Sequence, residues 1–492
     1  MQYKQTIMYM CFLVLLCGGT QISAQESDTT QQEEAIRKLE TRMDELKVQM
    51  AEIQSELEAI RGTKLPRPGS IVSVPPPSPP QLRVTPEQQE EAAGEATSHH
   101  QTFNQDEEDA PRLYNAPLEP EEPGFFHLPG TRTMMRLDGS VRSDFIYDPR
   151  NSTLSDAFVV SSIPIPSVSG NGNFLVSVRG SRAMADFLIP VGEQGQARTF
   201  IQLDFVGPNG TTSPRLRHFY GQLGNVLVGQ TFTNFMDPDA FADTLDTQGA
   251  NSAISARVPQ ARYSFGLGGG ASASVSLELP SSSILFSIAG TPITPTTPAP
   301  DGTFRFRYEW KRGHIQLASV FRDLGVKFPD GTHESTFGWG LNATGGVEVH
   351  GKDNIVLGVA YGHGIARYMG DSAGLNLDAA PISPTNLSLR ALPVFGTYGS
   401  YQHYWSTAVR SSLTGGFVQL QNTAFQSANI FHNSVYSAAN LIWSPIGSLD
   451  LGAEFLYGRV EAKSGVSAGD PRVQFTGRYS FVKLHPKEEN AP

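Results

Sequence analysis

Arginine residues in this chain recur at alternate positions of short segments whose other positions are aromatic or aliphatic. In the segment 304–311, Arg305 and Arg307 alternate with Phe304, Phe306 and Tyr308. Successive side chains of a β-strand point to opposite faces, so one face of this segment carries charge and the other is apolar. The charged face is suited to water and dissolved ions, and the apolar face is suited to lipid.

The same alternation predicts an inner, polar face on each strand, where arginine is more frequent than aspartate or glutamate. An excess of arginine on the inner wall of a channel would provide a path for anions. The alternative interpretation is that most of these charges pair with acidic residues and stiffen the wall. Arg179 has the parity of Leu175, which predicts a register slip or a β-bulge there. The arginines that parity assigns to the pore lining are Arg136, Arg142, Arg182, Arg198, Arg262, Arg305 and Arg307.

Four aspartates, Asp237, Asp239, Asp243 and Asp246, lie close together in the long connection 233–260. This connection is either an ordinary outer loop or a loop that folds into a channel as a constriction, where a patch of charge filters ions. Carboxylates at a constriction would oppose anion passage, but more strands contribute arginines to the wall, so we expect the wall to prevail. The spacing also suggests a calcium loop, although the glycine and terminal glutamate of an EF-hand are missing.

Other motifs lack the structural context that their chemistry needs. The segment 465–469 matches the nucleophile motif G-x-S-x-G, but it lies in a hairpin loop rather than at a strand-to-helix turn. The glycine-rich segment 266–271 is not followed by a predicted helix, as a dinucleotide-binding loop would be. Both cysteines, Cys11 and Cys17, lie in the predicted leader, so disulfides and cysteine metal sites are not expected. We therefore expect no enzyme, no cofactor and no metal site.

Composition excludes two further classes of protein. The chain has 492 residues, of which 39% are hydrophobic, and its only long apolar run is near the N-terminus, which excludes a helical membrane protein. Its net charge of -11 and the lack of a lysine or arginine cluster exclude a nucleic-acid partner.

The elements that must position the charged residues are strands of about ten residues with turns between them. The count of predicted strands is even, as expected for a bacterial single-chain barrel, and the connections between them alternate between long and short. The predicted fold is therefore all-β, a 16-stranded antiparallel transmembrane β-barrel preceded by an N-terminal α-helical coiled coil. The predicted strands are 134–148, 174–188, 197–206, 215–223, 225–232, 259–266, 270–279, 304–311, 314–322, 337–349, 354–368, 393–403, 405–420, 434–443, 449–460 and 472–482.

The N-terminal third has a different organisation. Lys4 and the apolar run that follows it predict a signal peptide cleaved after Ala24, and Leu16 argues against the alternative of a lipid-modified Cys17. Apolar residues spaced by three and four from Ile36 to Ile60 predict a coiled coil whose strand number the pattern leaves open. The predicted segments are a signal peptide at 1–24, the coiled coil at 25–61, a proline-rich and acidic disordered linker at 62–130, the barrel at 131–484 and a tail at 485–492.

Three stretches resemble one known family. They are 215–237 (RLRHFYGQLGNVLVGQTFTNFMD), 245–249 (LDTQG) and 262–265 (RYSF), and together with the coiled coil they are similar to the DcaP-like family of trimeric outer-membrane porins. The resemblance implies a 16-stranded barrel, trimeric assembly and passive uptake of small negatively charged solutes such as dicarboxylates. It also implies that Arg215, Arg217 and Asp246 lie near the channel entrance or constriction, so Arg215 and Arg217 join the predicted pore lining.

We therefore expect an outer-membrane porin for passive diffusion of small anionic solutes in a Gram-negative outer membrane, with the coiled coil and linker in the periplasm. Its expected partners are itself as a homotrimer, outer-membrane lipid and the anionic solutes. The alternative function is a non-conducting anchor or adhesin, with a plugged barrel and a coiled coil that tethers it to the cell wall. Single-channel conductance distinguishes the two.

Overall fold

The computed structural model describes residues 102–104, 111, 124–150, 156–166, 172–192, 195–288, 291–383 and 386–481. The predicted signal peptide, coiled coil and C-terminal tail lie outside these residues. In the described part of the chain, no helix is long and apolar enough to cross a membrane.

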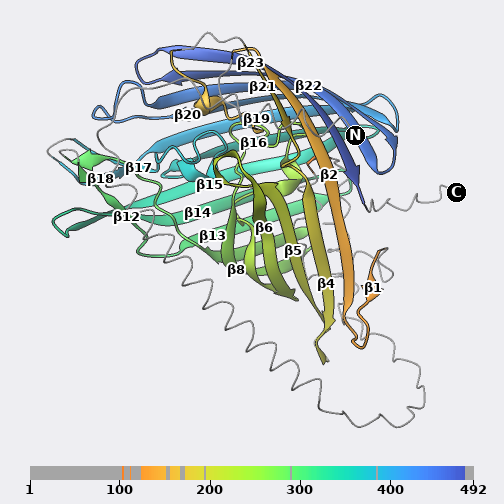
Figure 1. Ribbon diagram of the computed structural model, residues 1–492. Coiled ribbons are helices and arrows are strands. Elements are labelled where there is room, and N and C mark those ends of the chain that lie inside the picture. The colour runs from red at the N-terminus through yellow and green to blue at the C-terminus, as the bar shows by residue number, and fades with distance from the viewer. Residues whose placement is uncertain are drawn as a thin grey trace, which may run out of the picture. The chain divides into compact units, whose positions relative to one another are not determined.

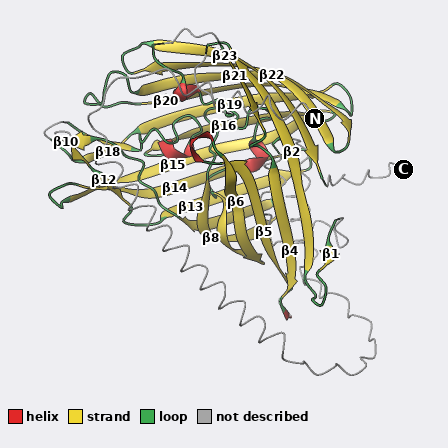
Figure 2. Cartoon of the chain, viewed as in Figure 1, coloured by secondary structure: helices red, strands yellow, loops and turns green. Residues whose placement is uncertain are grey.

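The described residues form one closed antiparallel barrel of sixteen strands (Figures 1 and 2). Each strand pairs with the next along the chain, and the first and last strands pair with each other, with Val141 opposite Tyr479. Closure leaves no free sheet edge, because every strand has two neighbours. The barrel strands are β2 (Met134–Asp148), β3 (Asn173–Ser177) with β4 (Arg182–Pro190), β5 (Gln196–Val206), β6 (Thr212–Leu223), β7 (Val226–Phe232), β8 (Arg257–Gly268), β9 (Ala271–Glu278), β13 (Asp301–Trp310), β14 (Gly313–Lys327), β15 (His333–His350), β16 (Asp353–His363), β19 (Pro393–Tyr404), β20 (Val409–Leu420), β21 (Phe431–Ile446), β22 (Leu449–Ala462) and β23 (Ser467–Ser480).

Smaller elements lie in the connections. A short strand, β1 (Phe126–His127), pairs with the start of β2, within the segment predicted as linker. The other short strands are β10 (Ser287–Ile288), β11 (Thr291–Pro292), β12 (Thr294–Thr296), β17 (Ala379–Pro381) and β18 (Leu389–Ala391), and the 3-10 turns are η2 (Val160–Ser162), η4 (Pro208–Gly210), η5 (Pro238–Ala240) and η6 (Ala366–Tyr368).

The barrel strands have the alternation that the sequence predicts. In β13, Phe304 and Tyr308 are 44% and 41% exposed, whereas Arg305 and Arg307 are buried on the opposite face. Apolar side chains thus cover the outside of the wall, and polar side chains fill its inside, since adjacent positions of a strand cannot face the same way.

One strand is interrupted where Arg179 does not fit the alternation. β3 and β4 both pair with β2, and residues 178–181 between them belong to neither strand. The interruption changes which parity faces inward, so Arg179 reaches Asp156 in the first long connection, with Nη1 3.1 Å from Oδ1. The predicted irregularity is therefore present. It lets β3 and β4 form one strand of the barrel although the inward-facing residues have odd numbers in β3 and even numbers in β4.

Several predicted boundaries are wrong. The strand predicted at 354–368 ends at His363, because Gly364 has φ 74° and the following residues form η6, with Tyr368 buried. The connections predicted as long at 323–336 and 461–471 are short turns at 328–332 and 463–466, since their strands continue. In β14 the apolar residues change face there: Phe321 is exposed, whereas Leu324 and Val326 are buried. The turn predicted at Tyr404 alone spans 405–408.

Candidate functional site

The connection between β7 and β8, residues 233–256, lies inside the barrel. Along its length it contacts inward-facing side chains of β9, β13, β14, β15, β19, β20, β21, β22 and β23. The loop therefore follows the inner wall from β9 to β23, and we call the remaining stretch of wall from β4 to β8 the open arc.

The first anchor of the loop is Asp237. Its carboxylate accepts hydrogen bonds from Arg307 Nη1 at 3.0 Å and from Thr344 Oγ1 at 2.6 Å, and it lies 3.0 Å from His314 Nε2. Asp239 pairs with the same arginine at 2.7 Å. Burial alone would raise the pKa of Asp237, but His314 and Arg307 hold it well below its usual value. The carboxylate is thus fully used in fixing the loop to the wall.

The second anchor is Asp243, on the far side of the lumen. Arg410 Nε of β20 and Gln402 Nε2 of β19 each donate to its Oδ2 at 2.8 Å. Asp243 is 0% exposed, and its Oδ1 accepts a hydrogen bond from the Phe103 N–H at 2.6 Å, so both of its carboxylate oxygens have protein partners.

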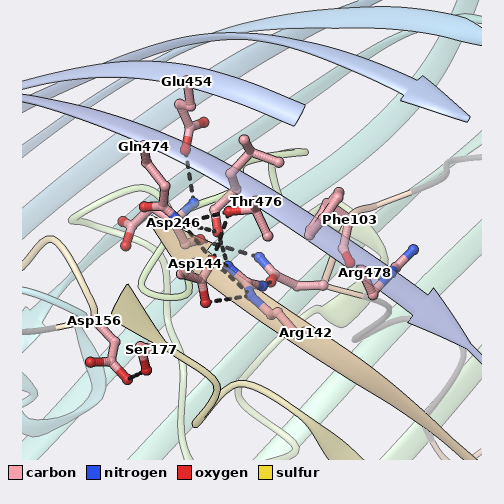
Figure 3. Close-up of polar contacts among 12 residues, drawn as sticks. Phe103, Arg142, Asp144, Asp156, Ser177, Asp246, Glu454, Gln474, Thr476 and Arg478 are labelled. Carbon is pink, nitrogen blue, oxygen red and sulfur yellow. Dashed lines mark hydrogen bonds and ion pairs between the residues drawn. The ribbon is translucent and has the colours of Figure 1, made fainter. Parts of the chain in front are cut away.

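Asp246 has a different role, in which its carboxylate shapes the backbone. It accepts hydrogen bonds from the backbone N–H groups of Phe158, at 2.8 Å, and of Gly249, at 3.2 Å. Its own N–H donates to Glu454 of β22 at 2.8 Å, as Figure 3 shows. Burial raises the pKa of Asp246. The four aspartates therefore hold the loop in place, and the structure does not present them as an exposed patch of charge.

The open arc carries a positive charge excess. The sequences of β4, β5, β6, β7 and β8 contain six arginines and two aspartates, with no lysine or glutamate. The arginines are Arg182, Arg198, Arg215, Arg217, Arg257 and Arg262.

The two aspartates of the open arc are each shared between arginines. Asp186 receives two hydrogen bonds from Arg198, at 2.9 and 2.8 Å, and lies 3.5 Å from Arg136. Asp204 receives two from Arg215, at 2.9 and 2.6 Å, and one from Arg217 at 3.2 Å. Sharing leaves the group of charges net positive, while the bidentate geometry fixes the guanidinium planes.

A buried histidine holds another arginine of this arc. His218 Nδ1 lies 3.0 Å from Thr231 Oγ1, and His218 Nε2 accepts a hydrogen bond from Arg257 Nε at 3.2 Å. Accepting this bond requires an unprotonated Nε2, so the ring is neutral. The guanidinium of Arg257 also lies over the Phe232 ring, 4.6 Å from its centroid. His218 thus positions Arg257 without adding charge.

The remaining predicted pore-lining arginines lie on inward-facing positions with partners of their own. Arg142 pairs with Asp144 at 2.9 Å and donates to the Leu245 carbonyl. Arg262 donates to Gln260 at 2.9 Å, and Arg305 is buried on the inner face of β13.

The predicted pore lining leaves out five inward arginines, among them Arg257 of the open arc, although strand parity already places Arg478 on the polar face. Four others tie loops or neighbouring strands to the wall: Arg322 to Asp301 and Asp378, Arg410 to Asp243, Arg472 to Asp148 and Arg478 to Asp450. The strand period would have identified Arg322 and Arg410, since both alternate with apolar residues in predicted strands. Arg257 precedes the predicted start of its strand, so no local signal marked it.

The motifs for other chemistry have no matching geometry. Ser467 of the G-x-S-x-G segment is the first residue of β23, so a strand and not a helix follows it. Among the described residues, no group of three or more histidine, cysteine, aspartate or glutamate side chains is arranged to hold a metal ion.

Comparison with known proteins agrees with this geometry. The crystal structure of the outer membrane channel DcaP of Acinetobacter baumannii is similar, with a TM-score of 0.64 and 23% identity over 72% of this chain and 99% of that chain. An anion-selective porin from Comamonas acidovorans has a TM-score of 0.47 and 10% identity over 71% of this chain and 100% of that chain. OmpT of Vibrio cholerae, expressed in the outer membrane, has a TM-score of 0.45 and 9% identity over 72% and 99%. No curated protein sequence matches the chain.

The family model described as DcaP outer membrane protein matches residues 127–481, which span the whole barrel. This match confirms the resemblance inferred from the sequence. The chain therefore belongs to the DcaP family of outer membrane proteins.

Proposed function

We propose that this protein is a passive diffusion channel of the outer membrane and that it prefers small anionic solutes, with dicarboxylates as the expected class. Membership of the DcaP family supports the channel, and the open arc supports the anion preference. The single observation that carries the preference is the excess of arginine over aspartate on β4–β8.

The ion preference of the channel depends on where the charges lie, and not on the net charge of -11. A charge outside the lumen is screened within about 8–10 Å at physiological ionic strength. The aspartates of the loop are paired with wall residues, so they offer little attraction to a cation. A solute in the lumen therefore meets guanidinium groups, which favour anions and form paired hydrogen bonds with carboxylates.

Planar-bilayer recording in a potassium chloride gradient tests this proposal. We expect the reversal potential of the wild type to show chloride preference, and the Arg257→Gln and Arg262→Gln variants to lower the chloride-to-potassium permeability ratio. Arg459→Gln is the matched control, because the Arg459 side chain is 54% exposed near the end of the barrel opposite the start of β2. Cation preference in the wild type would overturn the anion assignment, and absence of conductance would favour the non-conducting anchor.

Assembly and placement are part of the same proposal. We propose a homotrimer whose N-terminal coiled coil and linker lie in the periplasm. The long connections 233–256, 279–300 and 364–392 are at the end opposite the start of β2, and the longer loops of outer-membrane barrels face outward, with short turns in the periplasm. The heptad pattern from Ile36 to Ile60 supports self-association.

A further inference from the structure

A piece of the predicted linker lies inside the barrel. Residues 102–104 contact the loop 233–256 and the inner wall at β2, β4 and β23. Phe103 is 0% exposed and packs with Leu245 of the loop and Ile442 of β21. Figure 3 shows Phe103 beside Arg142 and Arg478. Burying a phenylalanine in this way makes residues 102–104 part of the lumen and not of an external spacer.

Three wall arginines bind oxygen atoms of this segment. Arg142 Nη1 donates to the side-chain oxygen of Asn104 at 2.8 Å, Arg182 donates to the Asn104 carbonyl, and Arg478 donates to the Phe103 carbonyl. Two of these guanidinium groups also lie over the Phe103 ring, that of Arg478 at 4.7 Å and that of Arg142 at 5.3 Å from its centroid. Cations within about 6 Å of an aromatic ring are attracted to it.

The nitrogen atoms of the segment bind the loop. The Phe103 N–H donates to Asp243 Oδ1 at 2.6 Å, and Asn104 Nδ2 donates to the carbonyls of Thr244 and Asp246, each at 3.2 Å. The segment therefore bridges the loop to the arginines of β2, β4 and β23. The Asn104 side chain, the Phe103 N–H and the two backbone carbonyls thus meet complementary partners, as the polar groups of a bound ligand do, whereas Thr102 Oγ1 is buried without a partner.

We propose that Phe103 and Asn104 form a tethered internal ligand of the channel, which occupies an arginine site that anionic solutes would otherwise use. This inference rests in part on the proposed anion channel. The carbonyl and amide oxygens stand where the oxygens of a carboxylate would lie, and Arg182 belongs to the open arc. Docking of the segment thus narrows the lumen and lowers the number of arginines available to a passing anion.

The bound segment is neutral at the atoms that face the arginines, which makes it displaceable. A carboxylate offers a guanidinium two oxygens in a bidentate geometry and a full negative charge, whereas each carbonyl or amide group of the segment offers one neutral oxygen. A small dicarboxylate therefore competes for Arg142, Arg182 and Arg478, while the covalent tether keeps the segment nearby at high effective concentration. Solute binding and release of the segment are linked in this arrangement.

Thiol labelling of the full mature chain tests the docking without reference to conductance. Both cysteines lie in the predicted signal peptide, so Thr102→Cys gives the mature chain a single thiol, at a position that is 6% exposed. Thr131→Cys is the matched control, because Thr131 is an exposed threonine in a turn before β2. We expect a water-soluble maleimide to label Thr102→Cys roughly tenfold or more slowly than the control, since labelling requires the segment to leave its site. Equal rates would overturn the docking.

Conductance then tests the effect on the channel. We expect the Phe103→Ala/Asn104→Ala double variant to have a single-channel conductance about twofold above that of the wild type, because the lumen is wider when the segment leaves. Phe126→Ala, an exposed phenylalanine on β1, is expected to leave conductance unchanged. An unchanged conductance in the double variant would overturn the role of the segment as a blocker.

Succinate, a small dicarboxylate, separates this inference from the proposed function. If both hold, succinate at millimolar concentration accelerates labelling of Thr102→Cys in the wild-type pore. If the channel prefers cations but the segment docks, labelling remains slow and succinate has no effect, which overturns the competition with anions while the docking stands.

Discussion

Replacing Asp237 by alanine removes the anchor that attaches the first half of the loop 233–256 to the wall. Asp237 is 2% exposed, and its carboxylate oxygens lie within 3.0 Å of side-chain atoms of Arg307, His314 and Thr344. Removing one partner of a buried ion pair costs about 3–5 kcal/mol, because the other charge is left without compensation. Arg307 retains Asp239 at 2.7 Å, so we expect the lower end of that range.

The loss of stability is confined to the first half of the loop, since Asp243 and Asp246 still hold the second half. A cost of about 3 kcal/mol corresponds to a roughly 100-fold fall in hydrogen-exchange protection if exchange occurs through local opening. Exchange measured by mass spectrometry in nanodiscs should therefore show faster exchange in peptides covering 233–242, with peptides of β22 unchanged. Single-channel recordings should show added current noise, because a released loop moves within the lumen.

Asp330→Ala is the control, because Asp330 lies in an exposed turn and its carboxylate bonds only to Thr332 among the contacts described. The Asp237→Asn variant should have an intermediate effect, since it retains the shape and loses the charge. If Asp237→Ala and Asp330→Ala leave loop exchange equally unaffected, the loop is not held by its aspartates and our reading of the lumen is wrong.

The other predictions concern ion selectivity, the pH dependence of stability, the register of β13 and assembly. Asp186→Asn should increase chloride preference in reversal-potential measurements, because two arginines lose the carboxylate that they share; a decrease would contradict the role of the open arc. Burial raises the pKa of Asp371 from 3.8 to about 7, so the folded barrel binds more protons than the unfolded chain between these values and loses stability as pH rises through them; the temperature at which the folded band disappears in gel electrophoresis should fall from pH 5 to pH 8, and less in Asp371→Asn. A cysteine at position 305 should react with a water-soluble reagent more readily than one at 304, whose side chain is on the outer face; the opposite order would overturn the register. The mature protein should have the mass of a trimer, and a variant without residues 25–124 should still form the barrel, since the first described strand begins at Phe126; a monomer or dimer would exclude the trimer.

Sequence patterns alone determined the barrel and its two faces. A period of two is a property of the extended backbone, so the strands could be identified one at a time, without knowledge of their neighbours. All sixteen predicted segments have a counterpart in the barrel. The boundaries failed where the outward apolar pattern ended: β14 continues with Leu324 and Val326 buried on the inner face, and β16 stops at Gly364 because of backbone conformation.

Only the tertiary structure decided what the charged residues do. Asp237 and Arg307 are 70 positions apart, and Phe103 and Asp243 are 140 positions apart. Such pairs form only after the barrel has closed and the loop has entered it, so no local pattern distinguishes a carboxylate that faces a solute from one that anchors a loop. The same closure placed a short piece of the predicted linker against Arg142 and Arg478, where composition had indicated a solvated spacer. Local periodicity therefore reveals the wall, whereas the occupancy of the lumen depends on contacts between distant segments.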